Sequence, residues 1–519
     1  MKERRFSQGV MLWLFLFGLV SGPIACALPA VFVQLDEEVT PQKPHSVPSM
    51  PTSTPTQHPL LALLPPTYKP GEVIPTPTPD PEREAPTIRT EILYHVVQPG
   101  ETLGLVAANY GISISQLSAV NRIYNPDLVS IGQVLTVPAP VRLARGPNFK
   151  IIPDSELVFG PSSALFDLKG EINHRQGYLA SYTQEIENRI LSGAEIVQLV
   201  AQRYSVNPRL LVALLEFQGG WLTNSELSWE KKVYPMGYYR PDWGGLFSQL
   251  SWAADQLNTG YYLWRAGWTG PFSFASGDVV VPGAGVNAGT VGVQNLFSQL
   301  YPVEAWRAVV AEGGFYETLI SLFGNPFERA TEPLVPQNLE QPQLQLPFEE
   351  GKSWSFTSGA HSAWGEGAGW AALDFAPPGP ALGCIPSNEW VVAIADGLII
   401  RADSGEVVQD IDGDGYEQTG WVVLYMHIQS HERVQRGKMV RAGDRIGHPS
   451  CEGGIATGTN LHIARKFRGE WIPADGPLPF TMDGWVSAGD GISYSGTMSR
   501  GQETIESCAC RSELNQISR

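Results

Sequence analysis

Positive charge is scarce in this chain of 519 residues. Lysine and arginine number 35 against 52 aspartates and glutamates, which gives a net charge of −17 at pH 7. This deficit argues against nucleic acid or an anionic surface as a partner, because both attract clustered positive charge. Hydrophobic residues reach 43%, which is enough for packed cores in the two to four domains expected at this length.

A hydrophobic run long enough to span a bilayer comfortably is also lacking near the N-terminus. The run Val10–Val20 is short, follows a basic start and precedes the small residues Ala25–Ala27. This order is typical of a signal peptide, which we place at residues 1–27. The alternative is a lipid anchor on Cys26, the only membrane attachment that we expect. Either interpretation predicts a protein outside the cytoplasm, secreted or attached to the cell envelope.

Two stretches lack hydrophobic periodicity and are rich in proline. Residues 28–92 contain proline/threonine-rich runs, and residues 331–350 are rich in proline and glutamine. Such composition favours extended polyproline II and cannot bury a core, so both stretches are predicted to be linkers. The linkers separate three predicted domains and a C-terminal tail, at residues 93–139, 150–330, 351–490 and 491–519.

The first predicted domain has the pattern of a small βααβ fold. Tyr94–Val97 suggests a strand, Thr102 can cap a helix over Leu103–Tyr110, a second helix begins near Ser115, and Val134–Val137 returns as a strand. The motifs closely resemble a LysM module, which implies binding to N-acetylglucosamine polymers. The family's two sugar-contacting loops correspond here to loops with Gly100, Glu101, Thr102, Leu103, Asn125 and Ile131. The alternative is a βααβ domain without a ligand.

The second predicted domain is mostly helical. Apolar residues recur at helical spacing over Ile186–Arg203, and Asn207 with Pro208 begins a second helix. That helix faintly resembles the opening of lysozyme-like lytic transglycosylases, but Gln218 stands where they have a catalytic glutamate. Because glutamine cannot donate a titrating proton, we expect a degenerate glycan-binding domain. A helical spacer and an active glycosidase are the alternatives.

Histidine and aspartate residues near the C-terminus form a candidate zinc site. His361, Asp374 and His462 suit a catalytic zinc, which has three protein ligands and leaves its fourth position to water. His427 is a further imidazole for proton transfer or for stabilising an oxyanion. Spacing alone does not establish the site, since a single histidine is more often structural.

The residues around these side chains resemble the lysostaphin-type (LytM) zinc endopeptidases, with the β-lytic and staphylolytic enzymes as the nearest branch. The resemblance rests on four ordered motifs, namely His361 with Asp374-Phe375, Tyr425–His427, Cys451–Gly454 and Asn460–His462. It implies an antiparallel-β domain in which His361, Asp374 and His462 bind zinc and His427 is catalytic. Asn460 stands where the family has a second catalytic histidine, so we expect reduced activity.

Cysteine is rare, with five residues in the whole chain. Without Cys26, the remaining four fit disulfides in an oxidising compartment, and four cysteines allow three connectivities. We expect Cys384 to pair with Cys451, since both flank the predicted catalytic sheet. The alternative is that the tail bearing Cys508 and Cys510 caps one of them.

One insert in the third predicted domain has the spacing of a calcium loop. Asp410, Asp412 and Asp414 match the first ligands of an EF-hand, and Gly415 permits its sharp turn. Position twelve is Trp421, so the bidentate glutamate is missing. A calcium-stabilised loop and an Asp/Gly-rich hairpin turn both stay open.

These features predict a multidomain α+β protein with a βααβ LysM domain, a mostly α-helical middle domain and a C-terminal antiparallel-β zinc peptidase domain. The predicted function is cleavage of peptide bonds in peptidoglycan by a zinc metalloendopeptidase that LysM holds on the glycan. Its partners would be the N-acetylglucosamine polymer and the stem peptides. The alternative is a weakened or inactive binding or activator module in a peptidoglycan-binding scaffold.

Overall fold

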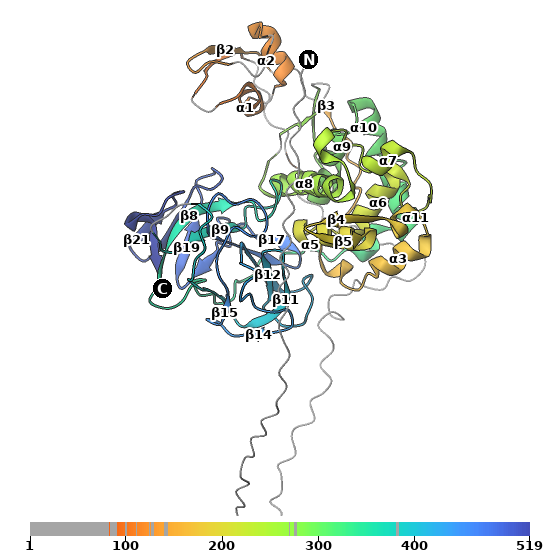
Figure 1. Ribbon diagram of the computed structural model, residues 1–519. Helices are drawn as coiled ribbons and strands as arrows, with labels where there is room; N and C mark the ends of the chain where they lie inside the picture. The colour runs from red at the N-terminus through yellow and green to blue at the C-terminus, as the bar shows by residue number, and fades with distance from the viewer. Residues whose placement is uncertain are drawn as a thin grey trace, which may run out of the picture. The chain divides into compact units, whose positions relative to one another are not determined.

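The computed structural model describes most of the chain. Figure 1 colours the described residues by their number, from orange near the N-terminus to blue at the C-terminus. The described residues are Arg83, 91–98, 101–110, 112–123, 125, 129–139, 144–268, 270–274, 278–379 and 383–519. The predicted signal peptide, most of the linker 28–92, and Gly100 lie outside them. Within the described residues, no helix has both the length and the apolarity needed to cross a membrane.

The LysM segment forms the predicted βααβ fold. Its elements are β1 (Leu93–Val96), α1 (Leu103–Asn109), α2 (Ile114–Asn121) and β2 (Val134–Val137). The two strands pair antiparallel, and Thr102 caps α1 by accepting a hydrogen bond from Leu105 N at 3.2 Å, as predicted. The side chain of Asn121 exchanges two 2.7 Å hydrogen bonds with the backbone of Thr136, so α2 is fixed to β2.

The middle region is helical, with short strands at its edges. Its helices are α3 (Leu168–Arg175), α4 (Tyr178–Ser181), α5 (Gly193–Tyr204), α6 (Pro208–Gly219), α7 (Trp229–Val233), α8 (Leu246–Arg265), α9 (Ala288–Ser298), α10 (Val303–Val309) and α11 (Phe315–Phe323). Its strands are β3 (Ala144–Arg145), β4 (Thr183–Ile186), β5 (Arg189–Ser192), β6 (Phe272–Ser273) and β7 (Val279–Val281). The start of α6 is as predicted, with Asn207 capping it through Arg209 N at 3.0 Å, and the left-handed Gly220 follows the end of the helix.

The helix predicted over Ile186–Arg203 is wrong in its first part. Glu187 and Asn188 take left-handed conformations with φ of 51° and 62°, which is the backbone of a tight hairpin turn between β4 and β5. Ile190 lies on β5 and is 77% exposed, so it does not belong to a buried helical face. The helix α5 begins only at Gly193, where Ser192 and Glu195 form a capping box.

The C-terminal region is built on antiparallel strands, as predicted. Nine strands of the described part of the chain form one sheet. Eight of them follow the order β14 (Met439–Val440), β11 (Gly397–Asp403), β12 (Glu406–Asp410), β13 (Trp421–Met426), β16 (Leu461–Phe467), β9 (Ala372–Ala376), β8 (Ser353–His361) and β22 (Gln516–Ser518). The ninth, β17 (Glu470–Trp471), pairs with β16. Smaller sheets pair β10 (Val391–Val392) with β15 (Arg445–Gly447) and join β18 (Thr481–Met482), β19 (Trp485–Ala488), β20 (Thr497–Arg500) and β21 (Glu503–Glu506).

The predicted linker and tail around this region both contribute to the folded domain. Residues 331–350 contain no helix or strand, but Leu344, Leu346 and Phe348 are buried in the core of the β domain. The predicted tail 491–519 includes β20, β21 and β22, and β22 pairs with β8. Leu344, Leu346 and Phe348 do alternate at the period of a strand, but the prolines among and before them led to the prediction of a linker.

One face of the large sheet packs against the helical domain. Val408, Val422 and Leu424 belong to the same buried core as the residues of α5, α6 and α8. This shared core contradicts the alternative that the middle domain is only a spacer.

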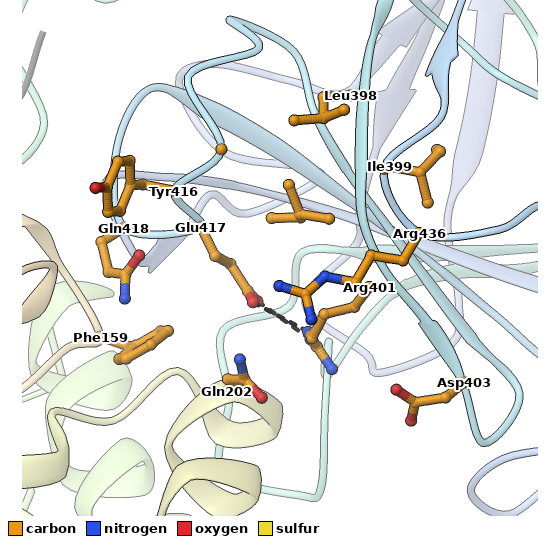
Figure 2. Close-up of a pocket in the computed structure, with 13 residues that line it drawn as sticks. Phe159, Gln202, Leu398, Ile399, Arg401, Asp403, Tyr416, Glu417, Gln418 and Arg436 are labelled. Atoms are coloured by element: carbon orange, nitrogen blue, oxygen red, sulfur yellow. Dashed lines mark hydrogen bonds and ion pairs between the residues drawn. The ribbon is translucent and has the colours of Figure 1, made fainter. Parts of the chain in front are cut away.

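A chain of buried ion pairs crosses the contact between sheet and helices. Arg203 of α5 lies 2.7 Å from Glu406, and Arg401 bridges Glu406 at 2.7 Å to Glu417 at 3.0 Å. Arg401 and Glu417 line a hollow of about 560 Å³, to which the helical domain contributes Phe159 and Gln202. Figure 2 shows the ion pair between Arg401 and Glu417. Removing one member would leave a buried charge without its partner, which is strongly destabilising.

Candidate metal centre and cleft

Three strands of the large sheet bring together the predicted zinc ligands. His361 ends β8, Asp374 lies in the middle of β9, and His462 is the second residue of β16. Asp374 and His462 are direct partners across the antiparallel pair, so their side chains lie on the same face of the sheet. An irregular register between β8 and β9 after Ser358 brings His361 to the same place.

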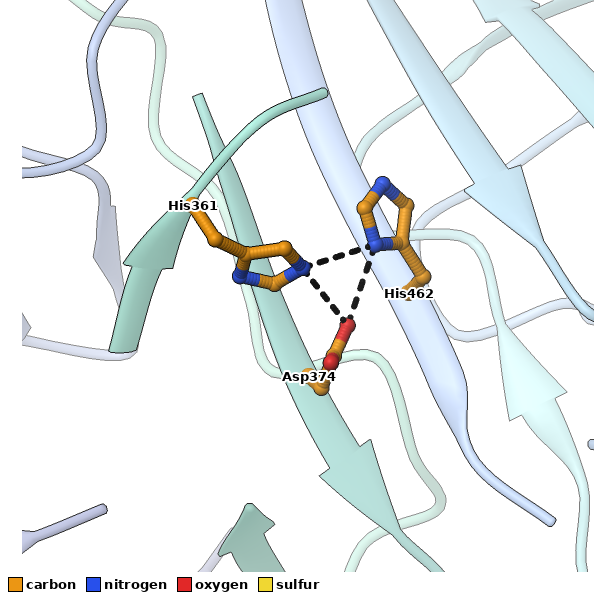
Figure 3. Close-up of side chains that lie close together, drawn as sticks. All are labelled: His361, Asp374 and His462. Atoms are coloured by element: carbon orange, nitrogen blue, oxygen red, sulfur yellow. Dashed lines mark hydrogen bonds and ion pairs between the residues drawn. The ribbon is translucent and has the colours of Figure 1, made fainter. Parts of the chain in front are cut away.

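The three side chains point toward one common position, as Figure 3 shows. His361 Nε2 lies 3.0 Å from His462 Nδ1 and 3.3 Å from Asp374 Oδ1, and His462 Nδ1 lies 3.1 Å from Asp374 Oδ1. Ligands in a tetrahedral zinc site with bonds of about 2.0–2.2 Å lie about 3.3–3.5 Å apart, so this donor set fits zinc after small adjustments. All three residues are buried.

Backbone carbonyls orient both histidine ligands. His361 Nδ1 donates to Gly359 O at 2.8 Å, and His462 Nε2 donates to Ala363 O at 3.1 Å. Each bond places the proton on the outer nitrogen and leaves the inner nitrogen free to bind a metal. Burial would raise the pKa of Asp374, but the imidazoles of His361 and His462 outweigh it and hold this pKa well below its usual value.

His427 lies next to the metal ligands on the same cleft. Its ring centroid is 6.2 Å from that of His462, and its Nδ1 lies 3.1 Å from Glu452 O. Burial, and then the neighbouring His462, lower the pKa of His427, which favours a neutral ring at neutral pH. Its φ of 65° is unusual for a residue with a side chain, and such conformations occur often at functional sites.

Asn460 lies directly before β16 and lines the same cleft as His462. Its side-chain oxygen is buried, and none of the described residues donates a hydrogen bond to it. Since buried polar atoms are normally hydrogen-bonded, this oxygen is available to accept a hydrogen bond from a donor that enters the cleft.

Tyr494 is a cleft residue that the sequence did not point to. Its ring stacks on His361, with centroids 4.5 Å apart, and its backbone bonds to Gly359 and Ala360. A left-handed φ of 69° turns the ring toward the ligand. Burial, and then Asp374, raise the pKa of Tyr494. It stands in the predicted tail, where no motif marked it.

The cleft around these residues has a volume of about 1240 Å³ and two walls. The β domain supplies one wall, with the metal ligands, His427, Asn460 and Tyr494. The helical domain supplies the other, with Tyr204, Trp243 and Phe247.

The disulfide of Cys384 and Cys451 forms as expected, and Cys508 pairs with Cys510.

The predicted calcium residues also lie close together, on the loop between β12 and β13. Ligand atoms of Asp410, Asp412 and Asp414 lie within 4.8 Å of one another, and Gly415 N donates to Asp410 at 2.8 Å. Burial, together with Asp412, raises the pKa of Asp410 to about 7. Glu417 cannot replace the missing bidentate ligand, because it is paired with Arg401 and Lys466.

The LysM residues that were predicted to contact glycan differ in exposure. Ile131 is 69% exposed, and Asn125 and Thr102 are also exposed. The carboxylate of Glu101 pairs with His95 at 2.7 Å. The side chain of Leu103 is fully buried in the LysM core, so a sugar-contacting role for that side chain is wrong.

The helical domain has no general acid at position 218, where lysozyme-like lytic transglycosylases have their catalytic glutamate. Gln218 accepts a 2.6 Å hydrogen bond from Tyr301. Glu216 accepts hydrogen bonds from Leu222 N and from both N and Oγ1 of Thr223. Glu216 therefore stabilises the turn after α6, and the active-glycosidase alternative has no support at this place.

Three family models match the chain, for the LysM domain at residues 95–138, the LasA N-terminal domain at 150–338 and Peptidase family M23 at 383–473. Protease LasA of Pseudomonas aeruginosa is 25% identical over 344 residues, 62% of this chain and 75% of that protein. N-acetylmuramoyl-L-alanine amidase XlyA of Bacillus subtilis is 40% identical over 60 residues, 12% of this chain and 20% of that protein.

Among solved structures, the M23 metalloprotease Pseudoalterin has 22% identity and a TM-score of 0.27, covering 32% of this chain and 96% of its own. The catalytic domain of lysostaphin from Staphylococcus simulans has 21% identity and a TM-score of 0.17, covering 24% and 89%. The model that matches the middle region is that of LasA, not of a lysozyme-like domain. The chain is therefore a LasA homologue with a LysM domain, and it is an M23 zinc metallopeptidase whose metal-ligand triad is His361, Asp374 and His462.

Proposed function

We propose that this protein is a secreted peptidoglycan endopeptidase, which LysM holds on the glycan while the M23 domain cleaves stem or cross-bridge peptides. The observation that carries the proposal is the cleft in which His427 and Asn460 lie beside the complete metal-ligand triad. Two disulfides and the similarity to LasA suggest an extracytoplasmic location. A cleaved signal peptide is favoured over a lipid anchor at Cys26.

In this proposal, the side chains beside the metal position the peptide and move the proton. When bound, zinc supplies a Lewis acid that polarises a carbonyl and acidifies water. His427 holds its Nδ1 proton against Glu452 O, so its other nitrogen is free to accept a proton. Asn460 donates its amide N–H to the developing oxyanion but cannot carry a proton.

The wall from the helical domain suits the sugar part of the same substrate. Trp243 is 40% exposed in the cleft and lies next to the ring of Tyr238, at 5.8 Å between centroids. Aromatic faces of this kind can stack on sugar rings, and a glycan strand always accompanies the stem peptides. We therefore keep the hypothesis that the middle domain binds glycan and place the contact at this wall.

Mass spectrometry of purified peptidoglycan after incubation with zinc-loaded protein tests the proposed activity. New peptide termini that a chelator prevents are expected, and their masses identify the cleaved bond. Absence of chelator-sensitive products on several wall types would favour the alternative, in which the M23 domain binds or activates without turnover.

Deleting residues 94–138 is expected to weaken sedimentation of the protein with insoluble peptidoglycan. LysM is the part of the chain most clearly matched to a glycan-binding family, and tethering raises the local concentration of substrate. The control is the full-length Asp374→Ala variant, which keeps LysM and should sediment like the native protein. If the deletion leaves sedimentation unchanged, the anchor lies in the helical domain.

Millimolar calcium is expected to raise the thermal unfolding midpoint of zinc-loaded protein by about 2–4 °C if the loop of Asp410, Asp412 and Asp414 binds it. The shift should be larger at pH 8 than at pH 6, since the pKa of Asp410 near 7 makes protons compete with the cation. The comparisons give no support to calcium, so this hypothesis stays a prediction. An equal shift in Asp412→Asn would rule out the loop as the site.

A further inference from the structure

The loop that follows the first zinc ligand is held by the helical domain. This loop, residues 362–371, connects β8 to β9. The carboxylate oxygen Oδ1 of Asp255, in the middle of α8, accepts hydrogen bonds from the backbone N–H groups of Glu366 and Gly367, each at 2.8 Å. A Cβ on Gly367 would lie 2.1 Å from the carbonyl oxygen of Asp255, so loop and helix are in direct backbone contact.

Aromatic contacts hold the same loop at a second place. Trp364 packs edge to face on Tyr204 with ring centroids 6.4 Å apart, and the guanidinium of Arg203 lies 5.2 Å from its ring. Both partners are on α5. Farther along, a Cβ on Gly369 would lie 3.0 Å from the ring of Tyr262 on α8. Two helices of the neighbouring domain therefore determine where this loop runs.

The loop in turn orients a metal ligand. Ala363 O accepts the 3.1 Å hydrogen bond from His462 Nε2, and Ala363 N donates to Gly369 O at 3.1 Å. With its outer nitrogen protonated by this bond, His462 presents Nδ1 to Asp374. A shift of the loop would remove the acceptor, and the imidazole could then change its tautomer or rotate away from the metal.

We propose that Asp255 is a positioning residue of the zinc centre, acting through the loop and Ala363 O on His462. Asp255 touches no metal ligand and belongs to a different domain. The helical domain would then be needed for tight zinc binding in addition to lining the cleft. This inference depends on the metal triad and does not require peptidoglycan to be the substrate.

The zinc affinity of full-length variants tests the proposal by competition with a chromophoric chelator. Asp255→Ala is expected to bind zinc about 10–100-fold more weakly, the usual effect of losing a group that orients a ligand. Asp255→Asn keeps an oxygen acceptor and should stay within about threefold of the native protein. Gln256→Ala is the matched control, because it shortens the neighbouring polar side chain of α8 and keeps the hydrogen bonds of Asp255 to the loop.

Cobalt substitution gives a second readout, since the visible spectrum of bound Co²⁺ reports the geometry of its ligands. The spectrum should change in Asp255→Ala and remain native in the other two variants. The proposal is overturned if Asp255→Ala keeps native zinc affinity and spectrum, if Asp255→Asn is equally impaired, or if Gln256→Ala weakens zinc binding to the same extent. If Asp255→Ala does not fold, Trp364→Ala releases the same loop, and native zinc affinity there would equally overturn it.

Discussion

Replacing Asp374 by alanine is expected to empty the metal centre and remove cleavage activity. Asp374 Oδ1 lies 3.1–3.3 Å from both histidine donor atoms and is the only anionic ligand of the triad. Without it, two neutral imidazoles remain in a buried site, and the protein should lose most of the roughly one zinc per chain that it otherwise carries. Since a polarising metal contributes several kcal/mol, turnover should fall at least about 1000-fold.

Metal analysis after dialysis, together with turnover on peptidoglycan, measures both effects of Asp374→Ala. Asp412→Asn is the matched control, because it removes a carboxylate from the other acidic cluster and leaves the cleft unchanged. The control should keep its zinc and its activity. Full zinc occupancy in Asp374→Ala would show that the ligands have been assigned wrongly.

Replacing His427 by alanine is expected to lower turnover about 10²–10⁴-fold while zinc content stays native. The reason is that His427 supplies general acid–base assistance but does not belong to the triad. Burial lowers the pKa of His427, so its ring should stay neutral and act as a base even at pH values below the usual histidine pKa. Zinc analysis separates this effect from loss of the metal.

Asn460→His is the complementary change and is expected to raise turnover. It introduces a second titrating group on a position that already faces the cleft. All variants should be assayed beside the native protein and a chelator control. The enzymatic proposal fails if the native protein shows no chelator-sensitive cleavage on any wall type and Asn460→His does not create it. A binding or activating role would then replace it.

The zinc site could be predicted because its residues stand in short motifs. The resemblance of the residues around His361, Asp374 and His462 to a known family identified these three as one set. The predicted caps at Thr102, Asn207 and Pro208 depend only on nearby residues, and they also agree with the structure.

Other features could not be predicted because their causes are distant in the sequence or are matters of conformation. Ile190 fits helical spacing, yet the left-handed pair before it makes a hairpin. Tyr494 reaches His361 through a left-handed backbone that has no sequence motif. The bonds of Asp255 to the loop after His361 span more than 100 residues, and a single sequence carries no signal for such a pair.

The buried charges between helices and sheet constrain how this enzyme can be recombined. A chimera that joined the β domain directly to LysM would leave Glu406 without Arg203 and would expose the apolar face around Val422 to water. Exchange of the helical domain for an unrelated one would meet the same obstacle. The helical and peptidase domains should therefore be inherited as one block, whereas LysM, with its own separate core, can be gained or replaced alone.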